Sequence, residues 1–145
     1  METTENRIGT EITVETTIDE PIEKVWEAWT NPEHVVHWNN ASPDWHTPMA
    51  KNNLAEGGKF LYRMEALDWS ESFDFNGIYD EIRPNKLISS ILEDWRRVKV
   101  VFENSNGKIK IKETFDAEDE NPIELQRDWW QAILDNFKKY TESLK

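Results

Sequence analysis

The chain has 145 residues, which is typical of one domain, and we predict a single domain over residues 1–145. Its formal net charge of −12 disfavours nucleic acid as a partner, because phosphate binding needs a basic surface, and it equally disfavours a polybasic membrane anchor. Cysteine is absent, which excludes disulfide bonds, cysteine-based zinc sites and thiol catalysis.

The first predicted elements are a strand and an amphipathic helix. Apolar and polar residues alternate over residues 11–18, which predicts the strand. In the helix that follows, we expect Asp19 or Glu20 to act as the cap and Pro21 to lie in the first turn. The apolar residues recur at the spacing of one helix face: Ile22, Val25, Trp26 and Trp29.

A second short helix is predicted directly after the first. Asn31 can cap it, Pro32 suits its start, and the pattern ends near Trp38. The next segment, residues 39–56, contains two prolines and several turn formers, so we expect it to be irregular.

The second half of the chain predicts strands joined by short turns and then one long helix. Alternating segments begin at Phe60 and Phe73, and three further strands lie in "KLISSIL", "VKVVFE" and "KIKIKETF". The predicted order is therefore one strand, two short helices, about six strands and one long helix, and the short connections between the strands favour antiparallel pairing. A helix from about Pro122 to Ser143 closes the chain, and its apolar stripe is centred on Trp130, Ile133, Leu134 and Phe137. We therefore interpret Trp130 as core, whereas Trp129 lies on a flank of the helix that would face the cavity rim. Helices segregated from an antiparallel sheet predict an α+β domain, with a cavity between a curved seven-stranded sheet and the long helix.

Three stretches resemble a known family. They are "PIEKVWEAWTNPEHVVHWNNASPDWHTPMAKNNLAEGGKF", "FDFNGIYDEI" and "WQAILDNFKKYTE", and the resemblance covers residues 10–143. The chain resembles the activator of Hsp90 ATPase homologue 1-like family, within the START/Bet v 1-like (SRPBCC, polyketide-cyclase-like) superfamily. The resemblance implies the helix-grip fold, in which two short helices and one long C-terminal helix accompany the curved sheet. It also implies a cavity for apolar or amphipathic small molecules.

The sequence departs from the family pattern at several turn positions. Trp69, Trp95 and Trp129 stand where the family usually has glycine, Asn53 replaces an aspartate and Ser72 a glycine. The resemblance places the three tryptophans around one mouth of the cavity. Two explanations stay open, an engineered variant with a redesigned mouth and a homologue specialised for a flat ligand. A third interpretation is that each ring simply packs on its own neighbour.

Candidate ligand-binding residues come from this mouth and from the inward faces of the strands. Most inward residues are expected to be core, while adaptable Met64 and polar-tipped Tyr62 are favoured for ligand contact. Gly77 lies on the inward phase and is expected to leave room for a cavity. The predicted ligand-binding set is Trp38, Tyr62, Met64, Trp69, Phe75, Trp95 and Trp129.

Two residues are weak candidates for catalysis, and they could in principle form an acid–base pair. His46 can serve as a general acid or base near neutral pH, and Glu113 shares the inward phase of its strand, where burial would raise its pKa. The alternative is a structural histidine and a strand-end glutamate near solvent. His34 and His37 are spaced i, i+3, but this pattern alone predicts no metal, and we predict no cofactor.

The favoured function is binding of a hydrophobic or aromatic small molecule in the cavity. The alternatives are a co-chaperone-like interaction with a weak protein partner, and a cyclase-like or acid–base enzyme that uses the cavity. The first 13 residues lack an apolar signal core, and no run of about 18 apolar residues exists, so we expect a cytoplasmic protein. Monomer and homodimer both remain open.

Overall fold

Seven antiparallel strands form one curved sheet in the computed structural model, which describes residues 10–144. The strand order is β1-β7-β6-β5-β4-β3-β2. In chain order the elements are β1 (Glu11–Ile18), α2 (Ile22–Thr30), α3 (Pro32–Trp38), β2 (Trp45–Asn52), β3 (Lys59–Ala66), β4 (Ser72–Arg83), β5 (Leu87–Leu92), β6 (Arg97–Ser105), β7 (Lys108–Asp116) and α4 (Ile123–Ser143). The predicted α+β fold, with two short helices and one long C-terminal helix, is confirmed.

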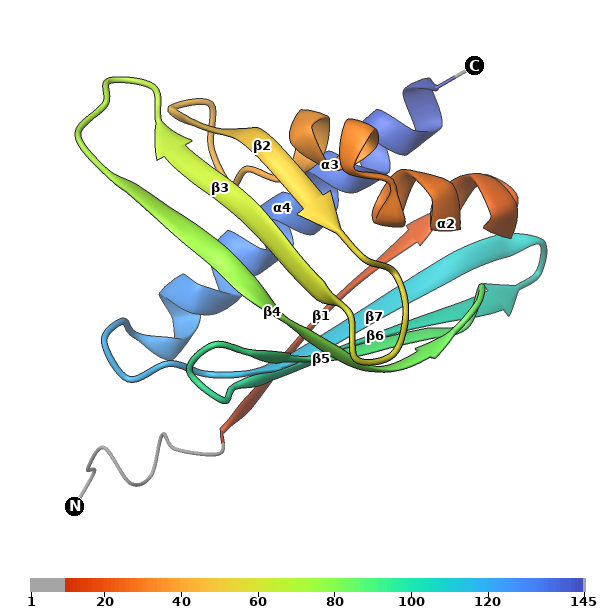
Figure 1. Ribbon diagram of the computed structural model, residues 1–145. Coiled ribbons are helices and arrows are strands. Elements are labelled where there is room, and N and C mark those ends of the chain that lie inside the picture. The colour runs from red at the N-terminus through yellow and green to blue at the C-terminus, as the bar shows by residue number, and fades with distance from the viewer. Residues whose placement is uncertain (1–9, 145) are drawn as a thin grey trace.

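The sheet curves around α4, and α2 and α3 lie together near the C-terminal half of that helix (Figure 1). On the sheet, α4 packs mainly against β1. The fully buried Leu134 and Phe137 anchor the helix, and Phe137 meets Trp29 and Trp38 edge to face at 4.8 and 4.9 Å between ring centroids. Such burial is the main source of stability in a domain of this size.

One strand was missed because its sequence does not look like a strand. The segment 39–56 was predicted to be irregular, yet it contains β2, which pairs with β3. The register shifts between His46 and Met49, around Pro48. Since β2 is an edge strand with a partner on one side only, a proline there removes few ladder hydrogen bonds and is tolerated.

The two short helices begin differently. Pro21 is the N-cap of α2, and no side chain caps this helix, so the prediction of an Asp19 or Glu20 cap is wrong. Glu20 instead forms an ion pair with Lys24 at 3.0 Å. The predicted cap of α3 is confirmed, because the Asn31 side chain accepts a hydrogen bond from a backbone N–H of the first turn at 2.9 Å.

Two tight turns hold tryptophan in a left-handed backbone conformation. Trp69, between β3 and β4, has φ 68°, and Trp95, between β5 and β6, has φ 72°. This region favours glycine, because a Cβ atom there crowds the following carbonyl group. Both side chains are more than 80% exposed, at 81% and 82%, so packing against the rest of the chain does little to offset the strain.

Two substitutions of Trp95 separate the effect of backbone strain on stability from the effect of losing the indole ring. Trp95→Gly and Trp95→Ala both remove the indole, but only glycine relieves the left-handed strain. We expect the glycine variant to be about 1 kcal/mol more stable than the alanine variant in urea denaturation. The same ordering is expected at Trp69. An alanine variant at least as stable as the glycine variant would show that the turns store no such strain.

Candidate functional site

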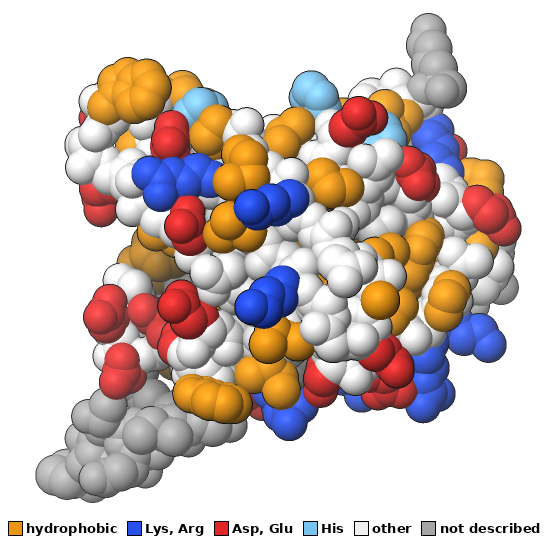
Figure 2. Space-filling model, viewed as in Figure 1, with side chains coloured by type: hydrophobic (Ala, Val, Ile, Leu, Met, Phe, Trp, Pro, Cys, Tyr) orange, Lys and Arg blue, Asp and Glu red, His pale blue; other side chains and the backbone are white. Residues whose placement is uncertain are grey.

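A cavity of about 860 Å³ lies between the concave face of the sheet and α4. Figure 2 shows its opening as a notch in the surface, with acidic side chains on both sides of it. Strands β3 to β7 contribute Phe60, Tyr62, Met64, Ser72, Phe73, Phe75, Tyr79, Ile88, Ser90, Val98, Val100 and Glu113, and α4 contributes Gln126, Trp129, Trp130 and Ile133. The remaining lining comes from α2, α3, β2 and the adjoining turns.

Aromatic rings form much of the wall. Trp130 stacks on Phe115, with centroids 3.8 Å apart and planes at 12°, and meets Phe75 edge to face at 6.0 Å. Phe75 also stacks with Tyr62 at 6.4 Å. These pairs orient the rings before any ligand arrives, so a planar apolar molecule would find a preformed aromatic surface.

Glu113 brings a carboxyl group into this apolar space. It lies on β7, opposite Val14 of β1 and Val100 of β6, and is only 7% exposed. No hydrogen bond or ion pair from another residue in the range 10–144 reaches its carboxyl group. Burial raises its pKa to about 8, because the charged form loses its hydration without gaining a partner. The group is therefore mostly protonated at neutral pH.

Tyr62 interacts with this carboxyl group, and Tyr79 interacts with Tyr62. Burial is the main cause that raises the pKa of Tyr62 far above its usual value, and Tyr79 and Glu113 raise it further. Burial also raises the pKa of Tyr79, whose hydroxyl accepts a hydrogen bond from the Asn52 side chain at 3.2 Å. All three groups are neutral near pH 7, so the depth of the cavity is polar but carries little charge.

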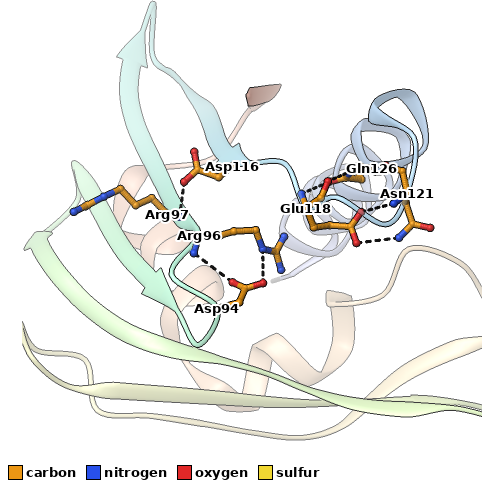
Figure 3. A network of polar contacts seen from close by, with 7 residues as sticks. All are labelled: Asp94, Arg96, Arg97, Asp116, Glu118, Asn121 and Gln126. Atoms are coloured by element: carbon orange, nitrogen blue, oxygen red, sulfur yellow. Dashed lines mark hydrogen bonds and ion pairs between the residues drawn. The ribbon is translucent and has the colours of Figure 1, made fainter. Parts of the chain in front are cut away.

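The mouth of the cavity is held by a network of polar contacts (Figure 3). Arg96 Nε lies 2.7 Å from Asp94 Oδ2 within the β5–β6 turn. In the loop between β7 and α4, Glu118 accepts hydrogen bonds from the backbone and side-chain nitrogens of Asn121 at 2.7 and 3.1 Å. Gln126, which is 2% exposed, accepts from Glu118 N and donates to the carbonyl oxygens of Glu118 and Asn121. The loop at the opening is therefore fixed by a buried amide.

The structure brings most of the predicted ligand-binding residues to the cavity. Those that line it are Trp38, Tyr62, Met64, Phe75 and Trp129. Trp69 and Trp95 do not line it: their turns lie beside the mouth, with Glu71 and Arg96 in the lining, but the two indoles point into solvent. The three tryptophans therefore do not form one aromatic ring around the opening. Ligand contact by the lining residues stays a prediction.

Two further expectations are wrong. His46 and Glu113 do not form a pair, because His46 lies on the edge strand β2 with its Nε2 3.7 Å from Glu65 Oε1, and it is not part of the cavity lining. Gly77 does not leave space for a ligand. A Cβ atom there would lie 3.0 Å from the ring of Phe60 and 2.5 Å from a backbone oxygen of Ile91, so the core fills that space.

Several lining residues were missed from the sequence. Trp45 escaped because its strand was not predicted, and Gln126 because a glutamine on a helix gives no signal of burial. Ser90 follows the inward phase of β5, which was the available signal. Trp130 was interpreted as core alone, yet it both packs on Phe115 and lines the cavity.

Two kinds of feature are absent from residues 10–144. This part of the chain contains no cluster of three or more His, Asp or Glu side chains arranged to hold a metal ion. None of its helices is long and apolar enough to cross a membrane.

A family model and a solved structure both match most of the chain. Residues 19–142 match the model of a family described as activator of Hsp90 ATPase homolog 1-like protein. The solution structure of an AHSA1-like protein from Aeromonas hydrophila is 40% identical, with a TM-score of 0.86, and the match covers 92% of this chain and 93% of that one. Among curated proteins, none matches the chain.

Two further solved structures share this fold at very different sequence identities. The protein Chr148 from Cytophaga hutchinsonii is 49% identical, with a TM-score of 0.81 over 91% of this chain and 92% of that one. The Aha1 dimer from Colwellia psychrerythraea is 15% identical, with a TM-score of 0.74 over 92% and 97% of the two chains, and at that identity it shows the fold alone.

The raised pKa of Glu113 predicts a pH-dependent stability. In the folded chain the group keeps its proton to about pH 8, whereas its ordinary pKa is 4.5. Between these two pH values the folded state holds one more proton than the unfolded state. The contribution of the protonated Glu113 to the free energy of unfolding is therefore fully present below pH 4.5 and is lost as pH rises toward 8. Glu113→Gln cannot ionise, so its stability relative to the parent chain should rise by about 1.4 kcal/mol per pH unit in this window.

Urea denaturation of both proteins at pH 5, 6.5 and 8 measures this difference. Taking the difference between the two proteins cancels the titration of the other carboxylates, including Asp68 and Glu142, whose pKa values are lowered by hydrogen bonds. A difference that does not change with pH would contradict a buried protonated Glu113.

Proposed function

This chain belongs to the family of activator of Hsp90 ATPase homolog 1-like proteins, and we propose that it binds a hydrophobic or aromatic small molecule in the cavity between the sheet and α4. The preformed cavity is the observation that carries this proposal. Its volume of about 860 Å³ lies within the range of known ligand pockets, about 300–1,000 Å³. Its lining combines many aromatic rings with a few polar groups, which is also typical of such pockets.

The arrangement of the lining supports binding more than chemistry. Glu113 is the buried acid, and the histidine proposed as its partner lies on a different strand outside the lining. A general acid without a base, nucleophile or oxyanion site gives no complete catalytic set. The cavity is therefore proposed as a binding site, and the cytoplasmic location stays a prediction.

A second candidate function is contact with another protein. Trp69 and Trp95 are 81% and 82% exposed at the tips of two turns, and Leu67 is 54% exposed beside the first. Aromatic side chains are enriched at protein–protein interfaces. Loss of a captured partner in a Trp69→Ser and Trp95→Ser double variant, with unchanged small-molecule binding, would separate this role from that of the cavity.

Titration with Nile red, a neutral dye that fluoresces in apolar surroundings, tests the cavity. We expect saturable binding by the parent chain. Ser90→Phe places a ring inside the cavity, because Ser90 is 6% exposed and part of its lining, and should weaken binding at least threefold. Ser89→Phe is the matched control: the same substitution on the opposite face of β5 should leave binding unchanged.

Either of two results would overturn the proposal. The first is the absence of saturable Nile red binding by the parent chain. The second is equal weakening by Ser90→Phe and Ser89→Phe, which would place the dye outside the cavity.

A further inference from the structure

Most of the charged residues in the cavity lining are acidic. Its charged residues are Glu71, Arg96, Glu113, Glu118 and Glu120. The guanidinium group of Arg96 is already bound to Asp94, with Nε 2.7 Å from Oδ2. An anionic ligand would therefore meet several carboxyl groups and one compensated cation, whereas a cationic ligand would enter a favourable potential. The net charge of −12 on the whole chain acts in the same direction.

Glu113 differs from the acidic residues at the mouth. The carboxyl group of Glu118 accepts hydrogen bonds from Asn121 and serves to fix the loop. Glu113 is 7% exposed, lies in the cavity wall, and receives no hydrogen bond or ion pair from residues 10–144. Its carboxyl oxygens are open to the cavity, because Thr141 Oγ1 is the one fully buried polar side-chain atom without a hydrogen-bond partner among the described residues. A ligand in the cavity can therefore reach the carboxyl group and supply the partner that it lacks.

The aromatic wall adds a second preference for a cation. Tyr62 lies close enough to Glu113 for the two groups to affect each other's charge, and it stacks with Phe75, which meets Trp130. The faces of such rings attract ammonium groups, most strongly where water is excluded. Their apolar edges and faces accept the hydrocarbon part of the same molecule.

We propose that the cavity selects hydrophobic or aromatic amines, with the carboxylate of Glu113 binding the ammonium group of the ligand. This inference rests on the proposed binding function and names the class of ligand. The ligand's ring system lies against the aromatic wall, and its ammonium group points toward β7. Binding of the ammonium form requires the Glu113 proton to leave, so one proton is released to solvent for each amine bound near neutral pH.

This coupling gives the affinity a pH dependence that a neutral ligand lacks. Tyr62 on β3 is the titratable group that interacts with Glu113, and Tyr79 on β4 interacts with Tyr62. Both pKa values are raised, so neither tyrosine ionises below pH 8. Val14 on β1 and Val100 on β6 do not titrate, and neither do the lining residues of α4, which are Gln126, Trp129, Trp130 and Ile133. The other charged residues of the lining are Glu71, Arg96, Glu118 and Glu120, which lie at the mouth.

Two matched probes test the proposal: 2-naphthylmethylamine and 2-naphthalenemethanol, which share one ring system and differ in the ammonium and hydroxyl groups. Each competes with bound Nile red at pH 6 and pH 8. For the parent chain at pH 8 we expect the amine to bind at least tenfold more tightly than the alcohol. Between pH 6 and pH 8 the amine affinity should rise at least tenfold, because Glu113 loses its proton while the amine keeps its own. The alcohol affinity should change less than threefold.

Two variants separate Glu113 from the general acidity of the mouth. Glu113→Gln keeps the shape of the side chain and should lose both the preference for the amine and the pH dependence, and the ratio of amine to alcohol affinity within each protein makes this comparison independent of any change in Nile red binding. Glu120→Gln removes one carboxylate at the mouth and should keep both. The pH series on the parent chain is decisive even where a variant fails to fold.

The outcomes distinguish this inference from the binding function itself. Nile red binding combined with equal affinities for the amine and the alcohol overturns the selectivity for amines and leaves the binding function standing. An amine preference that survives in Glu113→Gln also overturns the inference, since the ammonium group would then bind elsewhere. Absence of Nile red binding overturns the proposed function and, with it, the inference.

Discussion

The packing of α4 against one side of the sheet determines the rest of the structure. The helix lies mainly on β1, anchored by the buried Leu134 and Phe137 and by the stacking of Trp130 on Phe115. One helix, about 10 Å wide, covers only part of a curved seven-stranded sheet. The inward faces of β3, β4, β5 and β6 therefore line a space that no helix fills, and the cavity is a direct consequence of this geometry.

The same geometry explains why a carboxyl group is tolerated inside. Glu113 occupies a position where its strand neighbours Val14 and Val100 are apolar, and full burial of a charge there would be very costly. Keeping its proton avoids that cost at neutral pH, and the cavity leaves room for a ligand beside it. A hydrophobic residue at this position would be better for stability alone. A destabilised polar group in a preformed pocket is typical of a functional site.

Much of the fold follows from patterns in the sequence. Alternation predicted the strands that carry Phe60 and Val100, and the periodicity around Leu134 predicted the long helix. The edge strand β2 was hidden by Pro48, because an edge strand does not need the pattern of a central strand. The resemblance located the unusual turn residues Trp69 and Trp95, and their positive φ angles are those of glycine positions.

The site was harder to predict because strand phase gives the face of a residue but not its distant neighbours. Both His46 and Glu113 lie in strands, yet four other strands separate β2 from β7 in the sheet. The interpretation of the adjacent helix residues Trp129 and Trp130 from the sequence was also incomplete. Trp129 faces the rim, as expected, while Trp130 contributes to both core and cavity. Burial of Gln126 depends on a loop conformation that no local pattern specifies.

The protonation state of the buried Glu113 carboxyl group tests its availability to a ligand most directly. Its side-chain carboxyl carbon can be followed directly by ¹³C NMR across a pH titration, with Glu113→Gln used to assign the signal. We expect a midpoint near pH 8 in the free protein, and a clearly lower midpoint when 2-naphthylmethylamine saturates the cavity. A midpoint near the ordinary value of 4.5, or one that the amine leaves unchanged, would contradict the account.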